Sequence, residues 1–217
     1  MNRCRTLSDG AGLLIKRRGV LVVVSAPSGA GKTTLCHQVR SFVPRIFYSV
    51  SYTTRSPRPG ETNGVDFHFA TEEAFAAMRD RDEFAEWAAV HGHHYGTPAR
   101  PLEDALARGE DVLLDIDTQG ARALRKRYPE AVTVFIMAPS LAELEARLRE
   151  RKSDAPLEIT RRLARAREEM ASWREYDYLI INRDVKEAVE RLATIIQGER
   201  WRTSRLTIKF PDVEVPD

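Results

Sequence analysis

The segment APSGAGKT at residues 26–33 places two glycines, a lysine and a threonine in the spacing of a phosphate-binding loop. In such a loop consecutive backbone N–H groups point inward, and the helix that follows adds the positive end of its dipole. Lys32 is expected to reach the β- and γ-phosphates of a nucleoside triphosphate, and Thr33 to offer its hydroxyl to Mg²⁺. The residues predicted to bind the triphosphate are Ala26, Pro27, Ser28, Gly29, Ala30, Gly31, Lys32, Thr33 and Thr34.

The first position of this loop departs from the usual pattern, because it holds Ala26 where glycine is common. Alanine requires a negative φ there, which is a mild departure. A β-branched apolar run at 20–25 precedes the loop, and a helical stretch at 32–42, ended by Pro44, follows it. This order of strand, loop and helix favours a phosphate site over the alternative, a glycine turn that precedes a helix by chance.

Two acids follow a later apolar run at 112–114. Asp115 ends the run, where its carboxylate is either a ligand-side group that orients the water shell of a metal ion or a strand-end cap. Asp117, two residues on, points to the same side of an extended segment. The sequence therefore predicts Mg²⁺ as cofactor, held by Thr33 and, through water, by Asp115.

The elements that position these residues alternate along the chain. Short apolar runs and helical stretches follow one another, which predicts an α/β fold with a parallel sheet flanked by helices. We expect strands at 20–25, 112–115, 132–137 and 178–181, and helices at 32–42, 118–126, 140–151 and 185–202. Residues 52–97 break this order with prolines, glycines, an alternating strand at 66–69, a short helix at 71–80 and a strand at 84–90, which predicts an inserted mixed α+β lobe.

The composition is that of a folded protein, with 42% of the 217 residues hydrophobic and 30% charged. No apolar run approaches the ~20 residues that cross a bilayer, and a net charge of +2 gives no reason to expect nucleic acid. Cys4 and Cys36 have neither a disulfide nor a zinc pattern. We therefore expect a cytoplasmic protein with no membrane or nucleic-acid partner, a disordered basic tail at 1–18 and a second tail at 209–217.

A further pair of residues indicates a phosphorylated acceptor. Arg55 and Arg58 lie in a loop that prolines stiffen. Arginine forks suit the paired oxygens of a phosphate, although two loop arginines alone are more often solvated surface.

Five stretches together resemble the guanylate kinases. In chain order they are SAPSGAGKTT at 25–34, SVSYTTRSPRPG at 49–60, EFAEWAAVHGHHYG at 83–96, LDIDTQG at 114–120 and YDYLIIN at 176–182. The resemblance implies that ATP phosphorylates GMP to GDP, and we expect dGMP as a second acceptor. It also implies a core at 19–51 and 98–208, a GMP-binding lobe at 52–97 and an arginine-bearing helical lid at about 147–165.

By position, the resemblance assigns the GMP phosphate to Arg55, Arg58 and Tyr95, and guanine to Ser51, Glu86, Thr97 and Asp117. The chemistry of the base supports Glu86 independently, because guanine offers adjacent N1–H and N2–H₂ donors that one carboxylate can accept. Adenine has an acceptor at N1 and no 2-amino group, and a buried mismatch of this kind can discriminate by ~10⁴. The alternative is that Glu86 is an ordinary surface acid.

One GMP-site position departs from the family. Where the family usually has a tyrosine whose hydroxyl touches the GMP phosphate, this chain has Phe67. A hydrogen bond to a charged group is worth about 1.5–3 kcal/mol. Our hypothesis is that Arg55, Arg58 and Tyr95 hold the phosphate without it.

The lid carries a row of arginines, with Arg147 and Arg151 one helical turn apart. The resemblance implies that Arg147, Arg151 and Arg162 close onto the transferring phosphate, so that the expected catalytic residues are Lys32, Arg55, Arg147, Arg151 and Arg162. The alternative is an exposed helix whose arginines pair with Glu150, Glu158, Glu168 and Glu169, which we expect for Arg149, Arg161 and Arg167.

Two rival functions are consistent with parts of this pattern. Another phosphate-loop kinase of small phosphorylated acceptors would share Lys32 and the lid but would have no use for Glu86 and Ser51 around a base. A scaffold-type guanylate-kinase-like module binds phosphorylated partners, but such modules typically lose the loop lysine, which this chain keeps. The sequence leaves the oligomeric state, the GMP-to-dGMP preference and the dependence on monovalent cations undetermined.

Overall fold

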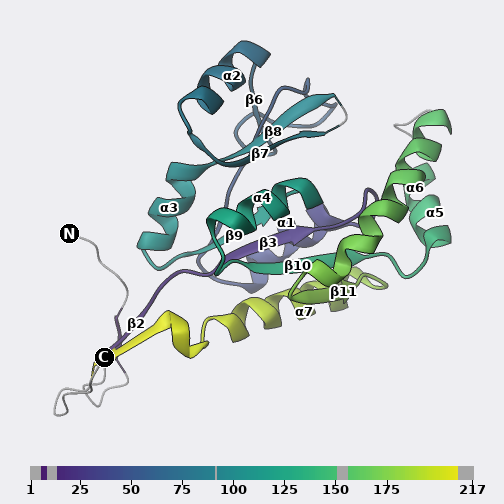
Figure 1. The fold of residues 1–217 in the computed structure, drawn as a ribbon. Helices are drawn as coiled ribbons and strands as arrows, with labels where there is room; N and C mark the ends of the chain where they lie inside the picture. The colour runs from purple at the N-terminus through teal and green to yellow at the C-terminus, as the bar shows by residue number, and fades with distance from the viewer. Residues whose placement is uncertain (1–5, 9–13, 91, 151–155, 210–217) are drawn as a thin grey trace.

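The computed structural model describes residues 6–8, 14–90, 92–150 and 156–209. Its centre is a five-stranded sheet in the order β11-β10-β3-β9-β4 (Figure 1). All neighbouring strands in it are parallel. The strands are β3 Leu21–Ser25, β4 Ile46–Tyr48, β9 Asp111–Asp115, β10 Val132–Met137 and β11 Tyr178–Ile181. The predicted α/β fold with a parallel sheet is confirmed, and β4 is a strand that the sequence did not predict.

Helices cover both faces of this sheet because each strand sends alternate residues to opposite sides. Val22 and Val24 of β3 pack with α1 and α7 in one buried cluster. Leu21 and Val23 pack with α3 and α4 in another. The bounds are α1 Lys32–Phe42, α3 Ala99–Ala107, α4 Thr118–Arg127 and α7 Val185–Glu199. Sequence reasoning found three of these helices and missed α3.

The inserted lobe lies at one end of the core, above α3 and α4 in Figure 1. Its four-stranded sheet has the order β6-β5-β8-β7, and its small core stacks Phe75 on Phe84 with ring centroids 4.5 Å apart. The elements are β5 Tyr52–Thr53, β6 His68–Phe69, α2 Glu72–Asp80, β7 Phe84–Val90 and β8 His93–Pro98. Strands and one helix are therefore mixed here, as the sequence predicted.

The segment expected to be the lid is a helical pair. Helix α5 Leu141–Glu150 and helix α6 Pro156–Ala171 stand side by side on the opposite side of the molecule from α3 (Figure 1). A 3-10 helix, η1 Ser172–Glu175, then leads into β11. No helix among the described residues is long and apolar enough to cross a membrane.

The expected disordered tail at 1–18 is wrong for the residues that the structure describes. Strands β1 Thr6–Ser8 and β2 Leu14–Arg17 pair antiparallel, and β12 Leu206–Lys209, which follows the 3-10 helix η2 Thr203–Arg205, pairs with β2. Lys209, expected to begin the second tail, closes β12. The two ends of the chain stabilise each other by this pairing, whereas each strand alone is too short to give a recognisable pattern.

A buried carboxylate fixes these ends to the central sheet. Asp111, at the start of β9, has no exposed side-chain surface and forms an ion pair with Arg17 of β2. It also accepts hydrogen bonds from Arg200 Nε at 2.6 Å and from the backbone N–H of Val20 at 3.0 Å. One acid thus joins segments from both ends of the chain.

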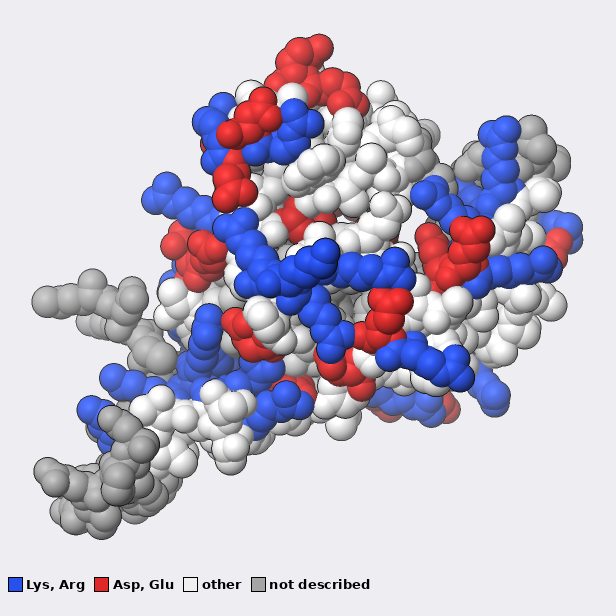
Figure 2. Space-filling model, in the orientation of Figure 1, with Lys and Arg blue, Asp and Glu red and all other residues white. Residues whose placement is uncertain are grey.

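Charged residues are mixed on the face shown in Figure 2. Basic side chains gather over the middle of this face, where Figure 1 places α4, and acidic groups lie between them. Three arginines of α4 are paired: Arg122 with Glu175, Arg125 with Asp177 and Arg127 with Glu103. This band is a set of ion pairs rather than an open row of positive charge.

Candidate active site

The phosphate loop joins β3 to α1. Gly29 and Gly31 adopt φ values of +91° and +93°, which L side chains rarely adopt. A Cβ on Gly31 would also lie 2.6 Å from the Asn182 side-chain nitrogen. Among the described residues the only non-glycine positions with positive φ are Arg45 and Asp82, so Ala26 keeps the negative φ that alanine requires. The departure at the first loop position is therefore tolerated without backbone strain.

Asn182, directly after β11, stabilises this loop from across the sheet. Its Nδ2 donates to the carbonyl of Ala30 at 2.8 Å, and its side chain is buried at 1% exposure. Its own carbonyl accepts from Arg147 Nη2 at 3.0 Å, which connects the loop to α5. Sequence reasoning gave Asn182 no role, although an amide directly after an apolar strand was a usable signal.

The two residues predicted to serve Mg²⁺ lie next to each other. Thr33 Oγ1 donates to Asp115 Oδ2 at 3.2 Å, and the hydroxyl of the half-buried Tyr48 donates to Asp115 Oδ1 at 2.9 Å. Burial, reinforced by the charge of Asp115, raises the pKa of Tyr48, so that Tyr48 is a neutral donor. Sequence reasoning missed Tyr48, because its strand β4 was not predicted.

This oxygen pair fits a magnesium ion that also binds phosphates. Mg²⁺ takes oxygen ligands and commonly uses one or two protein groups together with substrate phosphate oxygens. No group of three or more His, Cys, Asp or Glu residues in the described ranges could hold a metal ion by itself. The histidine of the inserted lobe at position 94 has other partners: Nδ1 of His94 lies 2.8 Å from Oε2 of Glu72, and its ring stacks on Phe75.

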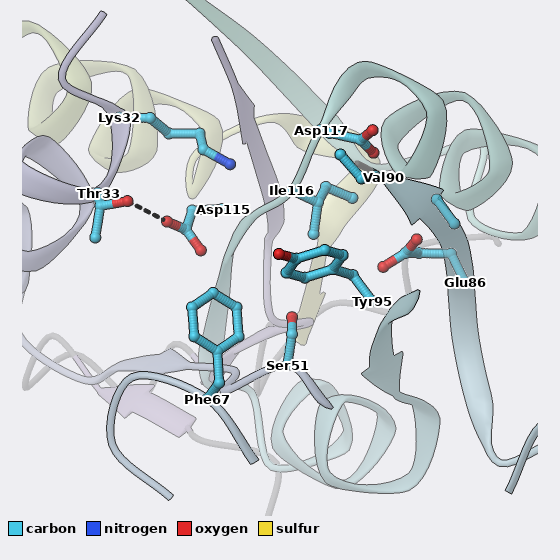
Figure 3. A pocket seen from close by; sticks show the side chains of 11 residues that line it. Lys32, Thr33, Ser51, Phe67, Glu86, Val90, Tyr95, Asp115, Ile116 and Asp117 are labelled. Carbon is cyan, nitrogen blue, oxygen red and sulfur yellow. Dashed lines mark hydrogen bonds between the residues drawn. The ribbon is translucent and has the colours of Figure 1, made fainter. Parts of the chain in front are cut away.

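A cavity of about 150 Å³ joins the phosphate loop to the inserted lobe. In Figure 3, Lys32 and Thr33 approach it from one side and Glu86 from the other, with Tyr95 between them. The residues that line the cavity are Lys32, Thr33, Ser51, Phe67, Glu86, Ala88, Val90, Tyr95, Asp115, Ile116 and Asp117. Eight of the predicted site residues thus meet at one place.

Glu86 is a buried acid and not a surface one. Its side chain points inward from β7, whereas its neighbour Trp87 is 43% exposed. Glu86 is 7% exposed, and its Oε1 accepts from the Thr97 hydroxyl of the paired strand at 2.6 Å. Burial, reinforced by the charge of Asp117 and opposed by the Thr97 hydrogen bond, raises the pKa of Glu86 to about 7.

Asp117 has a structural partner as well as a place in the cavity wall. It is the N-cap of α4, and its side chain accepts from the backbone N–H of Gly120 at 2.8 Å. Asp117 therefore ties the start of α4 to the cavity that Glu86 also enters.

The residues expected at the acceptor phosphate form a second group. Both carboxylate oxygens of Glu61 accept from Arg55 Nη2, at 2.8 and 2.9 Å. Burial lowers the pKa of Arg55, but the hydrogen bonds to Glu61 and Tyr95 outweigh it, and the net pKa is raised. Arg58 is exposed and contacts Glu61 through its backbone: its N–H donates to Glu61 Oε2 at 2.7 Å, and its carbonyl accepts from the Glu61 N–H at 3.0 Å. Sequence reasoning gave Glu61 no role, although an acid that follows two arginines in the same loop indicates an ion pair.

Phe67 supports Arg55 with its ring face. The Arg55 guanidinium carbon lies 5.4 Å from the centre of the Phe67 ring, which is within cation–π range. The Tyr95 ring meets Phe67 edge-on with centroids 5.9 Å apart. The residue that departs from the family pattern thus packs against Arg55 and Tyr95, two of the three residues assigned to the phosphate.

Of the three lid arginines expected at the transferring phosphate, the two that the structure describes lie outside the cavity. Arg147 pairs with Glu143 at 3.0 Å, and neither Arg147 nor Arg162 lines the cavity. Arg151 lies outside the described residues. Arg149, Arg161 and Arg167 are exposed, as expected.

Glu169 differs from its expected place as a partner of exposed arginines. It is half-buried on α6, and its Oε2 lies 3.4 Å from the backbone nitrogen of Ser28 in the phosphate loop. Burial raises the pKa of Glu169. The helical pair therefore touches the phosphate loop through this acid in the arrangement observed here.

Comparison with known proteins decides the family. A family profile described as guanylate kinase matches residues 18–199. The chain belongs to the guanylate kinase family. The curated guanylate kinase of Geobacter sulfurreducens is 50% identical over 192 residues, or 88% of this chain and 95% of that protein. The guanylate kinase of Carboxydothermus hydrogenoformans is 48% identical and is covered to 94%.

A solved guanylate kinase structure agrees with these matches. The crystal structure of guanylate kinase from Anaplasma phagocytophilum has 35% sequence identity and a TM-score of 0.77, and the match covers 88% of this chain and 92% of that one. The family that the five sequence stretches indicated is therefore confirmed. The sheet of β1, β2 and β12 lies outside the residues matched to the family profile.

Proposed function

We propose that this guanylate kinase transfers the γ-phosphate of ATP to GMP, giving ADP and GDP. The observation that carries the proposal is the single cavity that has Lys32 and Thr33 at one end and the Glu86–Thr97 pair at the other. With ATP bound at the phosphate loop and guanine bound at Glu86, the γ-phosphate of ATP and the phosphate of GMP would meet in the cavity between these two ends. Family membership supports the same reaction.

Glu86 would recognise the base through its charge. An ionised carboxylate accepts both N1–H and N2–H₂ of guanine, and Thr97 already fixes one of its oxygens at 2.6 Å. Adenine would leave this buried acceptor unpaired. Ser51 and Asp117, which line the same cavity, would complete the surroundings of the base.

Arg55, Arg58 and Tyr95 would hold the GMP phosphate. Both carboxylate oxygens of Glu61 now accept from Nη2 of Arg55, and a phosphate, whose paired oxygens suit a guanidinium, would take the place of this carboxylate. Because the Arg58 side chain is exposed, it can turn toward a ligand without leaving a packed environment.

The transfer would be in line and would need no general base, because the attacking phosphate oxygen is already ionised near neutral pH. Lys32 and Arg55 would neutralise charge that spreads over the transferred group. Thr33 and Asp115 would hold Mg²⁺, which supplies electrostatic stabilisation of the phosphate oxygens when bound. Closure of α5 and α6 would bring Arg147, Arg151 and Arg162 to the same group and exclude water.

Two further expectations belong to this proposal. The nucleotide dGMP differs from GMP only at the ribose 2′ position, away from the base and phosphate groups that the named residues would contact, so it should also be accepted. The cytoplasmic location stays a prediction from the sequence.

The reaction is tested by ADP release from ATP in the presence of GMP, AMP, UMP or no acceptor. GMP should give strong turnover, with AMP and UMP near the rate without acceptor. Strong turnover with AMP and none with GMP would overturn the proposal.

GMP binding should weaken as the pH falls through the raised pKa of Glu86. With a pKa of about 7, the ionised fraction of Glu86 falls about tenfold between pH 8 and pH 6, and the KM for GMP should rise by a similar factor. The Glu86→Gln variant is the control, because it keeps the titration of the GMP phosphate but removes that of residue 86. Identical pH profiles for the two proteins would contradict the assignment.

A rise in pH should strengthen GMP binding but should lower the stability of the ligand-free protein. A folded-state pKa raised above the unfolded value means that the ligand-free fold loses stability as the pH rises from about 4.5 to about 7. Glu86→Gln should therefore raise the Tm more at pH 8 than at pH 5. This readout does not depend on activity.

Phe67→Tyr should lower the KM for GMP. The added hydroxyl would lie beside Arg55 and Tyr95, where it can donate to the phosphate, at a net gain of about 1.5–3 kcal/mol for a hydrogen bond to a charged group. The KM for GMP of both proteins is measured by steady-state kinetics, with the GMP concentration varied at saturating ATP. An unchanged or higher KM would reject the hypothesis that this chain binds the phosphate with one donor fewer.

A further inference from the structure

Gly120 lies in the first turn of α4, directly behind Glu86. Its backbone N–H donates to the Asp117 side chain at 2.8 Å. A Cβ built on Gly120 would lie 2.6 Å from Glu86 Oε2 and 3.2 Å from both Glu86 Cδ and Asp117 Oδ1. Contacts under 3.0 Å are not tolerated by real Cβ atoms, so one group would have to move.

Backbone conformation does not explain this glycine. Gly120 is helical and is not among the described glycines with positive φ. In a helix alanine is the more favourable residue, because glycine loses more backbone entropy. Glycine is therefore required at this position by the lack of space for a side chain and not by the backbone conformation.

Glu86 has little freedom to give way. It is 7% exposed, and its other oxygen is fixed by the Thr97 hydroxyl at 2.6 Å. A Cβ at position 120 would push the carboxylate off α4 and into the cavity that Lys32 and Tyr95 also line. The displaced Glu86 carboxylate would then occupy the part of the cavity where the guanine base must bind.

We infer that Gly120 is a specificity-determining positioning residue: the missing side chain lets the Glu86 carboxylate lie back against α4 and leaves room for a guanine base. The inference rests on the proposed role of Glu86 as the guanine acceptor. The three atoms nearest to a Cβ built on Gly120 belong to Glu86 and Asp117, so the effect of a side chain there should be confined to the acceptor base.

The test is Gly120→Ala in the full chain, with GMP and IMP as acceptors. IMP has the N1–H of guanine but no 2-amino group, so it reports how well the carboxylate reaches both donors. The KM for GMP should rise at least about tenfold, and the preference for GMP over IMP should fall by a similar factor, because displacements of about 1 Å can cost up to 10²-fold. The KM for ATP should stay within about twofold, since ATP does not meet Glu86.

Gly198→Ala is the matched control. Gly198 is also helical, in α7, and a Cβ built there meets nothing within 4 Å. This variant should leave the KM values for GMP, IMP and ATP unchanged. An equal rise in the KM for GMP in both variants would overturn the inference.

A second variant pair keeps the test decisive if Gly120→Ala folds poorly. In a Glu86→Ala background the clashing carboxylate is gone, so Gly120→Ala should no longer lower the Tm. The double variant is therefore compared with Glu86→Ala alone. A fall in Tm between these two proteins as large as that between the unaltered protein and Gly120→Ala would overturn the inference.

The inference and the proposed function fail differently. If Glu86→Gln abolishes the preference for GMP but Gly120→Ala leaves it intact, the role of Gly120 is wrong and that of Glu86 stands. If Glu86→Gln also leaves the preference intact, the proposed guanine acceptor is wrong as well.

Discussion

Replacing Lys32 by alanine should lower the kcat for GMP phosphorylation by about 10²–10³-fold, as expected for the loss of one preorganised charge at a developing polyanion. Lys32 begins α1 directly after the loop, and its ammonium group points into the cavity (Figure 3). Both substrates are anionic, so charge neutralisation there is a large part of the barrier that the enzyme must lower. Single-turnover kinetics with saturating ATP and GMP measure the chemical step directly.

Two variants control this result. Lys186→Ala removes an exposed lysine of α7 and should leave kcat unchanged. Lys32→Arg keeps the charge on a bulkier planar group and should also lose most activity, because the loop fits a point charge. Near-normal turnover by Lys32→Ala, with an unchanged Tm, would contradict the proposed mechanism.

Replacing Asp111 by alanine should lower the free energy of unfolding by about 3 kcal/mol, the lower end of the cost of breaking a buried ion pair. Asp111 is fully buried, whereas its partners Arg17 and Arg200 keep 17% and 19% side-chain exposure and can partly recover water. For a chain of 217 residues this corresponds to a fall in Tm of about 6–12 °C.

Asp104→Ala is the matched control for that measurement. Asp104 is an exposed acid of α3 that pairs with Arg100 at 3.9 Å, and surface pairs of this kind contribute about 0–1 kcal/mol. Denaturant unfolding of both variants gives the comparison. Equal losses of stability would contradict a special role for Asp111, and unchanged kcat values in both would show that the effect is on the fold alone.

The central sheet could be predicted from the sequence because its signal is local. Strands β3, β9 and β10 are buried on both sides and therefore read as continuous apolar runs, and β11 at the sheet edge is also an apolar run. The helices between them have their own periodicity. The phosphate loop was predictable for the same reason. Gly29, Gly31, Lys32 and Thr33 are adjacent in the chain, and their conformation follows from residue type.

The sheet of β1, β2 and β12 could not be predicted in this way. Each strand is three or four residues long, and β12, which pairs with β2, lies at the other end of the chain. Asp111 likewise reads as an ordinary charged residue before an apolar run. Its burial is decided only when Arg17 and Arg200 reach it from both ends of the chain.

The sequence by itself determined the parallel α/β core, the phosphate loop and the family, because these depend on residue types at short, fixed spacings. Only the tertiary structure decided the state of the site. Pairing of β7 with β8 buries Glu86 against Thr97 and raises its pKa, and packing of α4 behind it leaves room only for glycine at position 120. Burial and close approach depend on residues far apart in the chain, and no local pattern records them.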